Sequence, residues 1–81
     1  MTVINSQLAA IIKYHRKQAK LSQVELAKLS GVGKTVIFDI ENGKESIRFN
    51  SLTKVLHALN ISLLWSSPLK NQFEKNKNED V

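Results

Sequence analysis

The stretch from residue 22 to residue 43 reads SQVELAKLSGVGKTVIFDIENG, and it decides the fold of this 81-residue chain. It opens on a capping box, in which the side chains of Ser22 and Glu25 satisfy each other's free backbone amides at the start of a helix. Gly31 can take the left-handed conformation that ends helices, and Gly33 is an acceptable N-cap for the next one. We therefore predict two short helices joined by a tight turn.

The spacing within this stretch is that of a helix-turn-helix. Counting from Gln23 as the first position, the fifth, ninth, fifteenth and eighteenth residues are Ala27, Gly31, Ile37 and Ile40. A small fifth residue lets the two helices approach closely, glycine makes the turn, and the two isoleucines pin the second helix onto the core. Ser30 departs from the apolar residue usual at the eighth position, but it is small enough to fit there.

Outside this stretch, apolar periodicity predicts two more helices and one strand. The expected helices are 6–19, 23–30, one from Gly33 to Asn42-Gly43, and one that starts between 46 and 50 and stops at Asn60. A strand is expected at 61–66, where Ile61, Leu63 and Trp65 share one face. Apart from this strand, the very short segment 2–4 is the one ordered part of the chain for which we predict no helix. We predict an all-α, compact four-helix domain over 1–68 and a flexible tail over 69–81.

Composition narrows the classes of protein that this sequence fits. A chain of 81 residues with 42% hydrophobic and 23% charged residues can build one small soluble domain. It has no cysteine, no secretory leader and no membrane-length apolar run, so we expect a cytoplasmic protein without disulfides. The net charge of +5 is confined to residues 1–68, with nine Lys/Arg against four Asp/Glu, and it favours a polyanionic partner.

The predicted strand indicates a second chain. A lone strand leaves its amide and carbonyl groups unpaired, and the rest of this chain offers it no neighbour. The simplest partner is the same strand of another copy, antiparallel across a two-fold axis. Such a homodimer also spaces two helix-turn-helix units for a palindromic DNA site.

The sequence resembles the Xre/phage-repressor family of helix-turn-helix proteins from about Leu8 to Leu59. The resemblance rests on Leu-Ser-Gln-x-x-Leu-Ala, on Ser-Gly-Val and on Ile-x-Asp-Ile-Glu-Asn-Gly. It implies sequence-specific binding to double-stranded operator DNA, with Lys34, Thr35 and Asp39 facing base edges in the major groove. The ring of Phe38 would either pack against a thymine methyl group or only cover the side of the helix.

The same resemblance assigns phosphate contacts and an internal ion pair. Ser22 and Gln23 lie where the family holds a phosphate at a helix N-terminus, and Lys44 and Arg48 would flank the same DNA backbone or remain solvated charges. Two further residues, Arg16 and Glu41, match the family's ion pair between the first helix and the end of the third. His15 falls where the family usually has an aliphatic core residue and is expected to be buried.

A helix-turn-helix followed directly by a strand resembles a narrower group, the HipB-like antitoxins that pair with HipA-like kinase toxins. This resemblance implies an autoregulating repressor with a possible kinase partner. A stand-alone repressor of the same fold is the alternative. In a different class, a protein-interaction adaptor or an RNA binder would use the basic face without reading DNA. We find no metal, cofactor or catalytic pattern and expect no enzyme.

Overall fold

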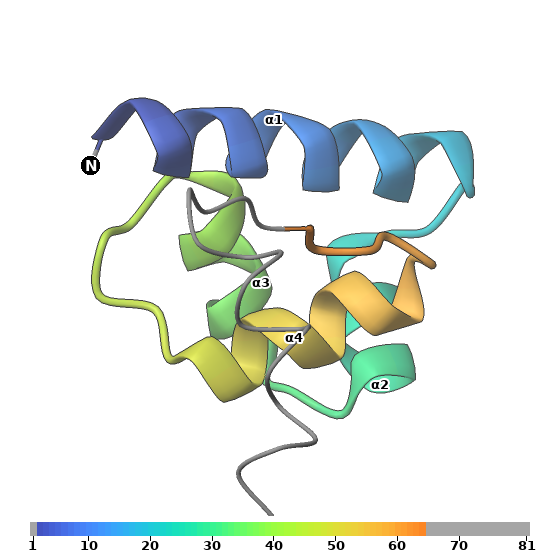
Figure 1. Cartoon of the computed structure of the whole chain (residues 1–81). Coiled ribbons are helices and arrows are strands. Elements are labelled where there is room, and N and C mark those ends of the chain that lie inside the picture. The colour runs from blue at the N-terminus through green and yellow to red at the C-terminus, as the bar shows by residue number, and fades with distance from the viewer. Residues whose placement is uncertain (1, 65–81) are drawn as a thin grey trace, which may run out of the picture.

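The computed structural model describes the backbone of residues 2–64 and the side chains of residues 6–64, and it contains four helices (Figure 1). They are α1 (Thr2–Gln18), α2 (Gln23–Ser30), α3 (Lys34–Glu41) and α4 (Phe49–Ala58). α1 lies along one side of the molecule and packs on α3, while α2 packs on both α3 and α4. The prediction of a compact, all-α, four-helix domain is confirmed for this part of the chain.

The start of α1 differs from the prediction. The helix begins at Thr2 rather than near Ser6, so the segment 2–4 is helical. The β-branched Thr2, Val3 and Ile4 each lower helix propensity by only a fraction of a kcal/mol, roughly 0.7 at most. Adding residues to a helix that has already nucleated is far easier than starting one. The long apolar pattern that follows is therefore enough to extend the helix to the second residue.

α2 and the turn after it follow the prediction to the residue. The Ser22 hydroxyl accepts a hydrogen bond from the Glu25 amide at 3.0 Å, and the Glu25 carboxylate accepts one from the Ser22 amide at 2.7 Å. Gly31 adopts the left-handed conformation, with φ of 77°, and its amide bonds to the Ala27 carbonyl. Local capping chemistry therefore sets both ends of this helix.

One apolar core joins all four helices. Its buried members are Ile12 of α1, Leu26 and Ala27 of α2, Ile37 and Ile40 of α3, and Val55 and Leu56 of α4. Ala27 is small, and α2 and α3 meet beside it, as the helix-turn-helix spacing requires. The core thus fixes α3 on one side and leaves its other side toward solvent.

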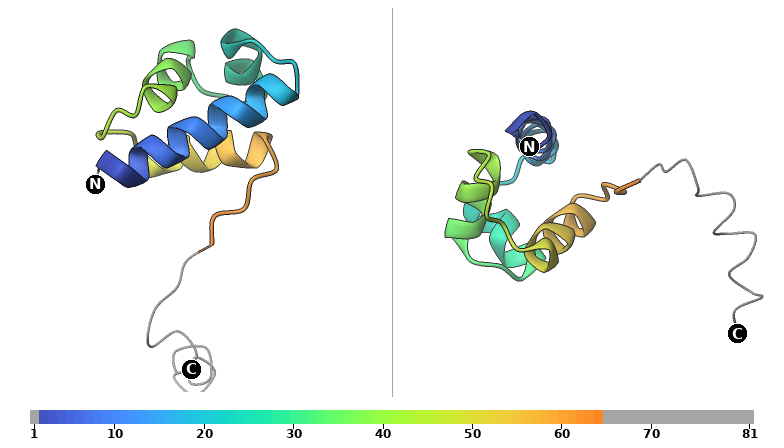
Figure 2. Two further views of the ribbon diagram at one scale, coloured as in Figure 1. Left: turned by 90° about the horizontal axis from the view of Figure 1, so that it is seen from above. Right: turned by 60° about the vertical axis from the view of Figure 1, so that its left-hand side comes forward.

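The segment after α4 leads away from the helices (Figure 2). Ile61 still packs against the core, whereas Leu63 and Leu64 are exposed. Residues 61–64 form no strand within the described chain, and Trp65, Ser66 and the predicted tail 69–81 lie outside the described residues. The strand between subunits therefore stays a prediction. None of the described helices combines the length and apolarity needed to cross a membrane.

Candidate nucleic-acid interface

The two sides of α3 have opposite characters. Ile37 and Ile40 are 0% and 5% exposed, since the core covers them. Lys34 and Thr35 lie on the solvent side, and Phe38 is 53% exposed. The helix begins at the N-cap Gly33 and ends at Asn42, so its eight residues make just over two turns. A helix this short, anchored on one side, offers a compact outward surface.

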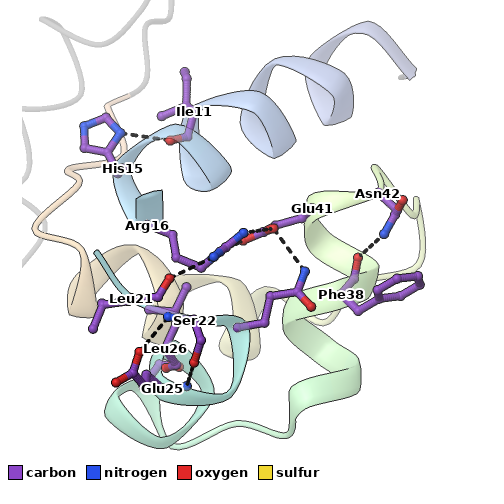
Figure 3. A network of polar contacts seen from close by, with 12 residues as sticks. Ile11, His15, Arg16, Leu21, Ser22, Glu25, Leu26, Phe38, Glu41 and Asn42 are labelled. Carbon is purple, nitrogen blue, oxygen red and sulfur yellow. Dashed lines mark hydrogen bonds and ion pairs between the residues drawn. The ribbon is translucent and has the colours of Figure 1, made fainter. Parts of the chain in front are cut away.

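A buried polar network holds the C-terminal end of α3 to α1 (Figure 3). The Arg16 guanidinium grips the Glu41 carboxylate with two hydrogen bonds, from Nε at 2.6 Å and from Nη2 at 3.0 Å. Its remaining Nη1 donates to the Leu21 carbonyl, just before α2, at 2.8 Å. The two side chains are only 10% and 3% exposed. A two-pronged pair of this kind fixes orientation as well as distance, so it sets the tilt of α3 relative to α1.

Gln23 connects the start of α2 to this network. Its side-chain amide donates to Glu41 Oε1 at 3.2 Å. The Glu41 carboxylate thus accepts hydrogen bonds from both α1 and α2 while belonging to α3. Gln23 is half-buried, and its position relative to the outward face of α3 is fixed through Glu41.

Four of the predicted DNA-contacting residues lie around one open hollow on the surface. The hollow is lined by Gln23 of α2 and by Lys34, Thr35 and Phe38 of α3. Lys34, Thr35 and Phe38 lie together because residues three and four apart share one side of a helix. The tight turn at Gly31 brings the first residue of α2 beside them. The structure therefore combines a candidate phosphate contact and candidate base contacts in a single surface.

Asp39 is paired within the chain. Its Oδ2 lies 3.4 Å from Lys44 Nζ, and the two side chains are 25% and 54% exposed. Lys44 follows α3, where the Gly43 amide bonds to the Ile40 carbonyl and the chain turns with φ of 74° at Gly43. An exposed pair at this distance contributes about 0–1 kcal/mol, so either partner can exchange it for a nucleic-acid group.

The remaining predicted phosphate contacts, Ser22 and Arg48, lie at helix N-termini. The Ser22 hydroxyl accepts a hydrogen bond from the Glu25 amide in the capping box. Hydrogen bonding from the Ser22 backbone and hydroxyl lowers the pKa of the Glu25 carboxyl below its ordinary value. Arg48 is the exposed N-cap residue of α4.

Comparison with known proteins identifies the family to which this arrangement of four helices belongs. A family model described as helix-turn-helix matches residues 12–66, which is more than half of the chain. The chain belongs to the Xre-type helix-turn-helix family of DNA-binding transcriptional regulators. The matched segment begins within α1 and includes the whole of α2, α3 and α4.

Proteins similar to this helix-turn-helix protein include two curated relatives and a solved structure. The ImmF control region 10 kDa protein of Bacillus phage phi105 is 37% identical over 57 residues, which are 70% of this chain and 63% of the phage protein. The uncharacterized HTH-type transcriptional regulator y4mF of Sinorhizobium fredii is 34% identical over 58 residues, covering 72% of this chain and 76% of that protein. The chain therefore spans somewhat less than two thirds of the phage relative's length.

One similar solved structure is that of a HipA-HipB-O2-O3 complex, in which HipB is the chain that matches. Its TM-score is 0.70 and its sequence identity is 30%. The match covers 79% of this chain and 90% of the other. The helix-turn-helix architecture thus extends to a sequence with fewer than a third of its residues in common.

The structure of this helix-turn-helix protein corrects the prediction for His15. We expected a buried histidine, but His15 is exposed, and its Nδ1 lies 2.9 Å from the Ile11 carbonyl of its own helix. The core-facing stripe of α1 runs through Ala9, Ile12 and Arg16. The guanidinium of Arg16 fills the inward position, and its neighbour His15 is turned toward solvent.

Sequence reasoning missed three polar contacts around α3. Besides the bond from Gln23 to Glu41 and the pair of Asp39 and Lys44, the Asn42 side-chain amide donates to the Phe38 carbonyl at 2.7 Å. The Asn42 contact had a local signal, because an amide side chain at a helix end often bonds back to a carbonyl four residues earlier. The bond between Gln23 and Glu41 spans 18 residues and has no such signal.

Proposed function

We propose that this chain is a sequence-specific transcriptional repressor whose α3 enters the major groove of double-stranded DNA. The observation that carries the proposal is the outward surface of α3, which presents different hydrogen-bonding groups on a helix fixed from behind. Lys34 would donate to O6 and N7 of guanine, Thr35 would contact a thymine methyl group, and Asp39 would accept from N4 of cytosine. We propose no enzymatic activity and no cofactor.

Phosphate contacts would set the register of α3 in the groove. The N-terminal end of α2 supplies free backbone amides and the Ser22 hydroxyl, and the Gln23 side chain lies beside them. Lys44 and Arg48, both exposed, would neutralise phosphates on the side where α3 ends and α4 begins. The net charge of +5 also favours DNA as the partner, and it predicts an affinity that falls as the salt concentration rises.

Binding would rearrange the pair of Asp39 and Lys44. In the free protein Lys44 contacts Asp39 at 3.4 Å. A DNA phosphate would compete for the Lys44 ammonium, and the released Asp39 carboxylate would then accept from a base amino group. The small energy of an exposed ion pair makes this exchange inexpensive.

A gel-shift comparison tests the DNA proposal. The probes are duplex DNA from upstream of the protein's own gene, a scrambled duplex of equal length, and double-stranded RNA of the same sequence. We expect retardation of the upstream duplex at a protein concentration that leaves the other two unshifted. Equal retardation of all three, or none, would contradict sequence-specific DNA readout and favour the RNA-binding or adaptor alternative.

A homodimer joined through residues 61–66 is the second part of the proposal. In the single chain Leu63 and Leu64 are 49% and 86% exposed, so an apolar surface is available at this end of the domain. An antiparallel pairing with a second copy would cover it and present two α3 helices to a palindromic operator. Trp65→Ala and Leu63→Ser should both lower the sedimentation coefficient to that of a monomer at low micromolar concentration. A fully dimeric Trp65→Ala variant would show that any dimer forms elsewhere.

Resemblance to HipB favours an autoregulating antitoxin, acting in the cytoplasm with a HipA-like kinase as partner. The alternative is a stand-alone repressor of the same fold, and the likeness to a phage control-region protein favours it. Co-expression with the product of the adjacent gene separates them. A stoichiometric complex with a kinase is expected of an antitoxin. If the neighbour is no kinase, or no complex survives purification, the stand-alone repressor is correct.

The segment 69–81 would then be tested within that complex. Phe73 is the one large apolar residue of this segment after Leu69, and it would be the anchor if the segment binds the kinase. Truncation after Leu69 should weaken the complex in that case. An unchanged complex would identify the segment as a solubilising end, with the kinase held by the folded domain.

A further inference from the structure

Phe38 is the one large apolar side chain among the outward residues of α3. It is 53% exposed and contributes nothing to the buried core. A single exposed apolar residue is common on protein surfaces and needs no function by itself. Phe38, however, lies in the hollow that Gln23, Lys34 and Thr35 also line. This surface is otherwise polar, and it is the one proposed to face the bases.

The major groove offers this ring only one kind of apolar group. Base edges in the groove present hydrogen-bond acceptors, amino donors and the C5-methyl group of thymine. We propose that the hollow at Phe38 binds a thymine methyl group, so that the protein distinguishes thymine from an unmethylated pyrimidine at one position of each half-site. This inference rests on the proposed function and specifies one base of its target.

The surroundings of the hollow suit a methyl group. Thr35 lies three residues before Phe38 and Lys34 four residues before it, so both line the same hollow as the ring. Their side chains include apolar carbon, a methyl group in threonine and methylenes in lysine. Gln23, which also lines the hollow, is held by its 3.2 Å bond to Glu41. The Asn42 amide bonds to the Phe38 carbonyl at 2.7 Å and steadies the last turn of the helix. The Gln23 side chain and the backbone at Phe38 are therefore held in place before DNA arrives.

Replacing thymine with deoxyuridine tests the inference, because it removes only the methyl group. A preferred duplex is first selected with the full chain from a random double-stranded library. Each thymine of that duplex is then replaced by deoxyuridine, one symmetric pair at a time. We expect one pair to weaken binding by about fourfold per methyl group, the factor given by burying one such group.

Variants assign the effect to Phe38. With Phe38→Ala, the thymine and deoxyuridine duplexes should bind equally at that position, while Lys54→Ala, which removes an exposed lysine of α4 outside the hollow, should keep the difference there. Phe38→Leu should keep part of it. Because the ring is 53% exposed, we expect Phe38→Ala to fold, and its thermal unfolding is measured alongside.

Four results would overturn the inference. In the first, no deoxyuridine replacement weakens binding of the wild-type protein, and in the second, Phe38→Ala still binds the deoxyuridine duplex more weakly than the thymine duplex. In the third, binding changes only when a cytosine is replaced by 5-methylcytosine, where it becomes tighter. In the fourth, the library yields no preferred duplex. The third would identify 5-methylcytosine as the source of the methyl group. Only the fourth would also overturn the proposed function, so the two failures are distinguishable.

Discussion

The inward and outward sides of α3 show how one helix serves stability and recognition separately. Inward, Ile37, Ile40 and Glu41 meet the core and the Arg16 guanidinium. Outward, Lys34 and Phe38 contact little of their own chain and line an open hollow. Inward substitutions should therefore change the free energy of unfolding, and outward ones should change which DNA is bound. The first two predictions below test this division, and the others test the local interactions that set the helix ends.

The largest effect is expected from breaking the buried ion pair. Arg16→Met leaves the Glu41 carboxylate, 3% exposed, without its cation, and should lower the free energy of unfolding by about 3–5 kcal/mol. Urea denaturation measures it. The double variant Arg16→Met/Glu41→Leu removes both charges and should be more stable than Arg16→Met alone. A single variant as stable as the wild type would show that the pair does not hold α3 in place.

The next largest effect is expected on DNA affinity, from substitutions that should leave the free energy of unfolding unchanged. Lys34→Ala should weaken binding to the preferred duplex by about 1–3 kcal/mol and relax the preference at one base pair. Arg48→Ala is the matched control, because loss of a phosphate contact should weaken all duplexes alike and reduce the salt slope by about one. Titrations at several salt concentrations measure both. If the two variants behave alike, the division between base and phosphate contacts is wrong.

A moderate effect is expected at the capping box. Ser22→Ala removes the hydroxyl that accepts from the Glu25 amide and should lower the free energy of unfolding by about 1 kcal/mol. Thermal unfolding monitored by circular dichroism measures this. Ser51→Ala, in the first turns of α4, is a control with no cap to lose. Equal losses from the two variants would contradict the capping role.

The capping box also predicts a pH dependence. Its hydrogen bonds lower the pKa of Glu25 in the folded protein relative to the unfolded chain. The stabilisation is therefore complete above the unfolded pKa and is lost as the pH falls through the folded one. Unfolding curves recorded from neutral to acidic pH should lose less stability in Glu25→Gln than in the wild type. Equal losses of stability in the variant and the wild type would show that Glu25 does not contribute to the pH dependence.

The smallest effect concerns the helix ends. Within residues 2–64, four residues adopt the left-handed conformation, and they are Gly31, Gly43, Lys20 and Asn60. Lys20, with φ of 59°, is the one poorly suited to that conformation, so Lys20→Gly should raise stability by about 0.5–1 kcal/mol. Asn60→Gly should gain less, because asparagine tolerates it. A loss of stability on Lys20→Gly would mean that the Lys20 side chain has a stabilising contact.

How far the sequence could predict this molecule depended on the range of each interaction. α2 and its caps were predicted to the residue, because Ser22, Glu25 and Gly31 act within a few residues of one another. The exposure of His15 was not predicted. Which of two neighbouring residues on α1 faces the core depends on how the helix is rotated against it, and the local sequence does not fix that rotation. The bond from Gln23 to Glu41 joins two helices and depends on their final packing.

The outward side could be predicted only in part. The family resemblance assigned DNA contacts to Lys34, Thr35 and Phe38, and the fold brings these residues together with Gln23. Periodicity shows which residues avoid the core, but not what pairs with them outside it. The contact between Asp39 and Lys44, five residues apart around the end of a helix, depends on the path of the turn at Gly43.

The most direct test of the central claim, that the outward side of α3 reads DNA, is an NMR titration of the nitrogen-15-labelled protein with its selected duplex. We expect the amide signals of Lys34, Thr35, Phe38 and Asp39 to shift most, together with those at the start of α2. The exposed side of α1, at Ile11 and Tyr14, should shift little. Shifts concentrated on Ile11 and Tyr14, with α3 unaffected, would contradict the account.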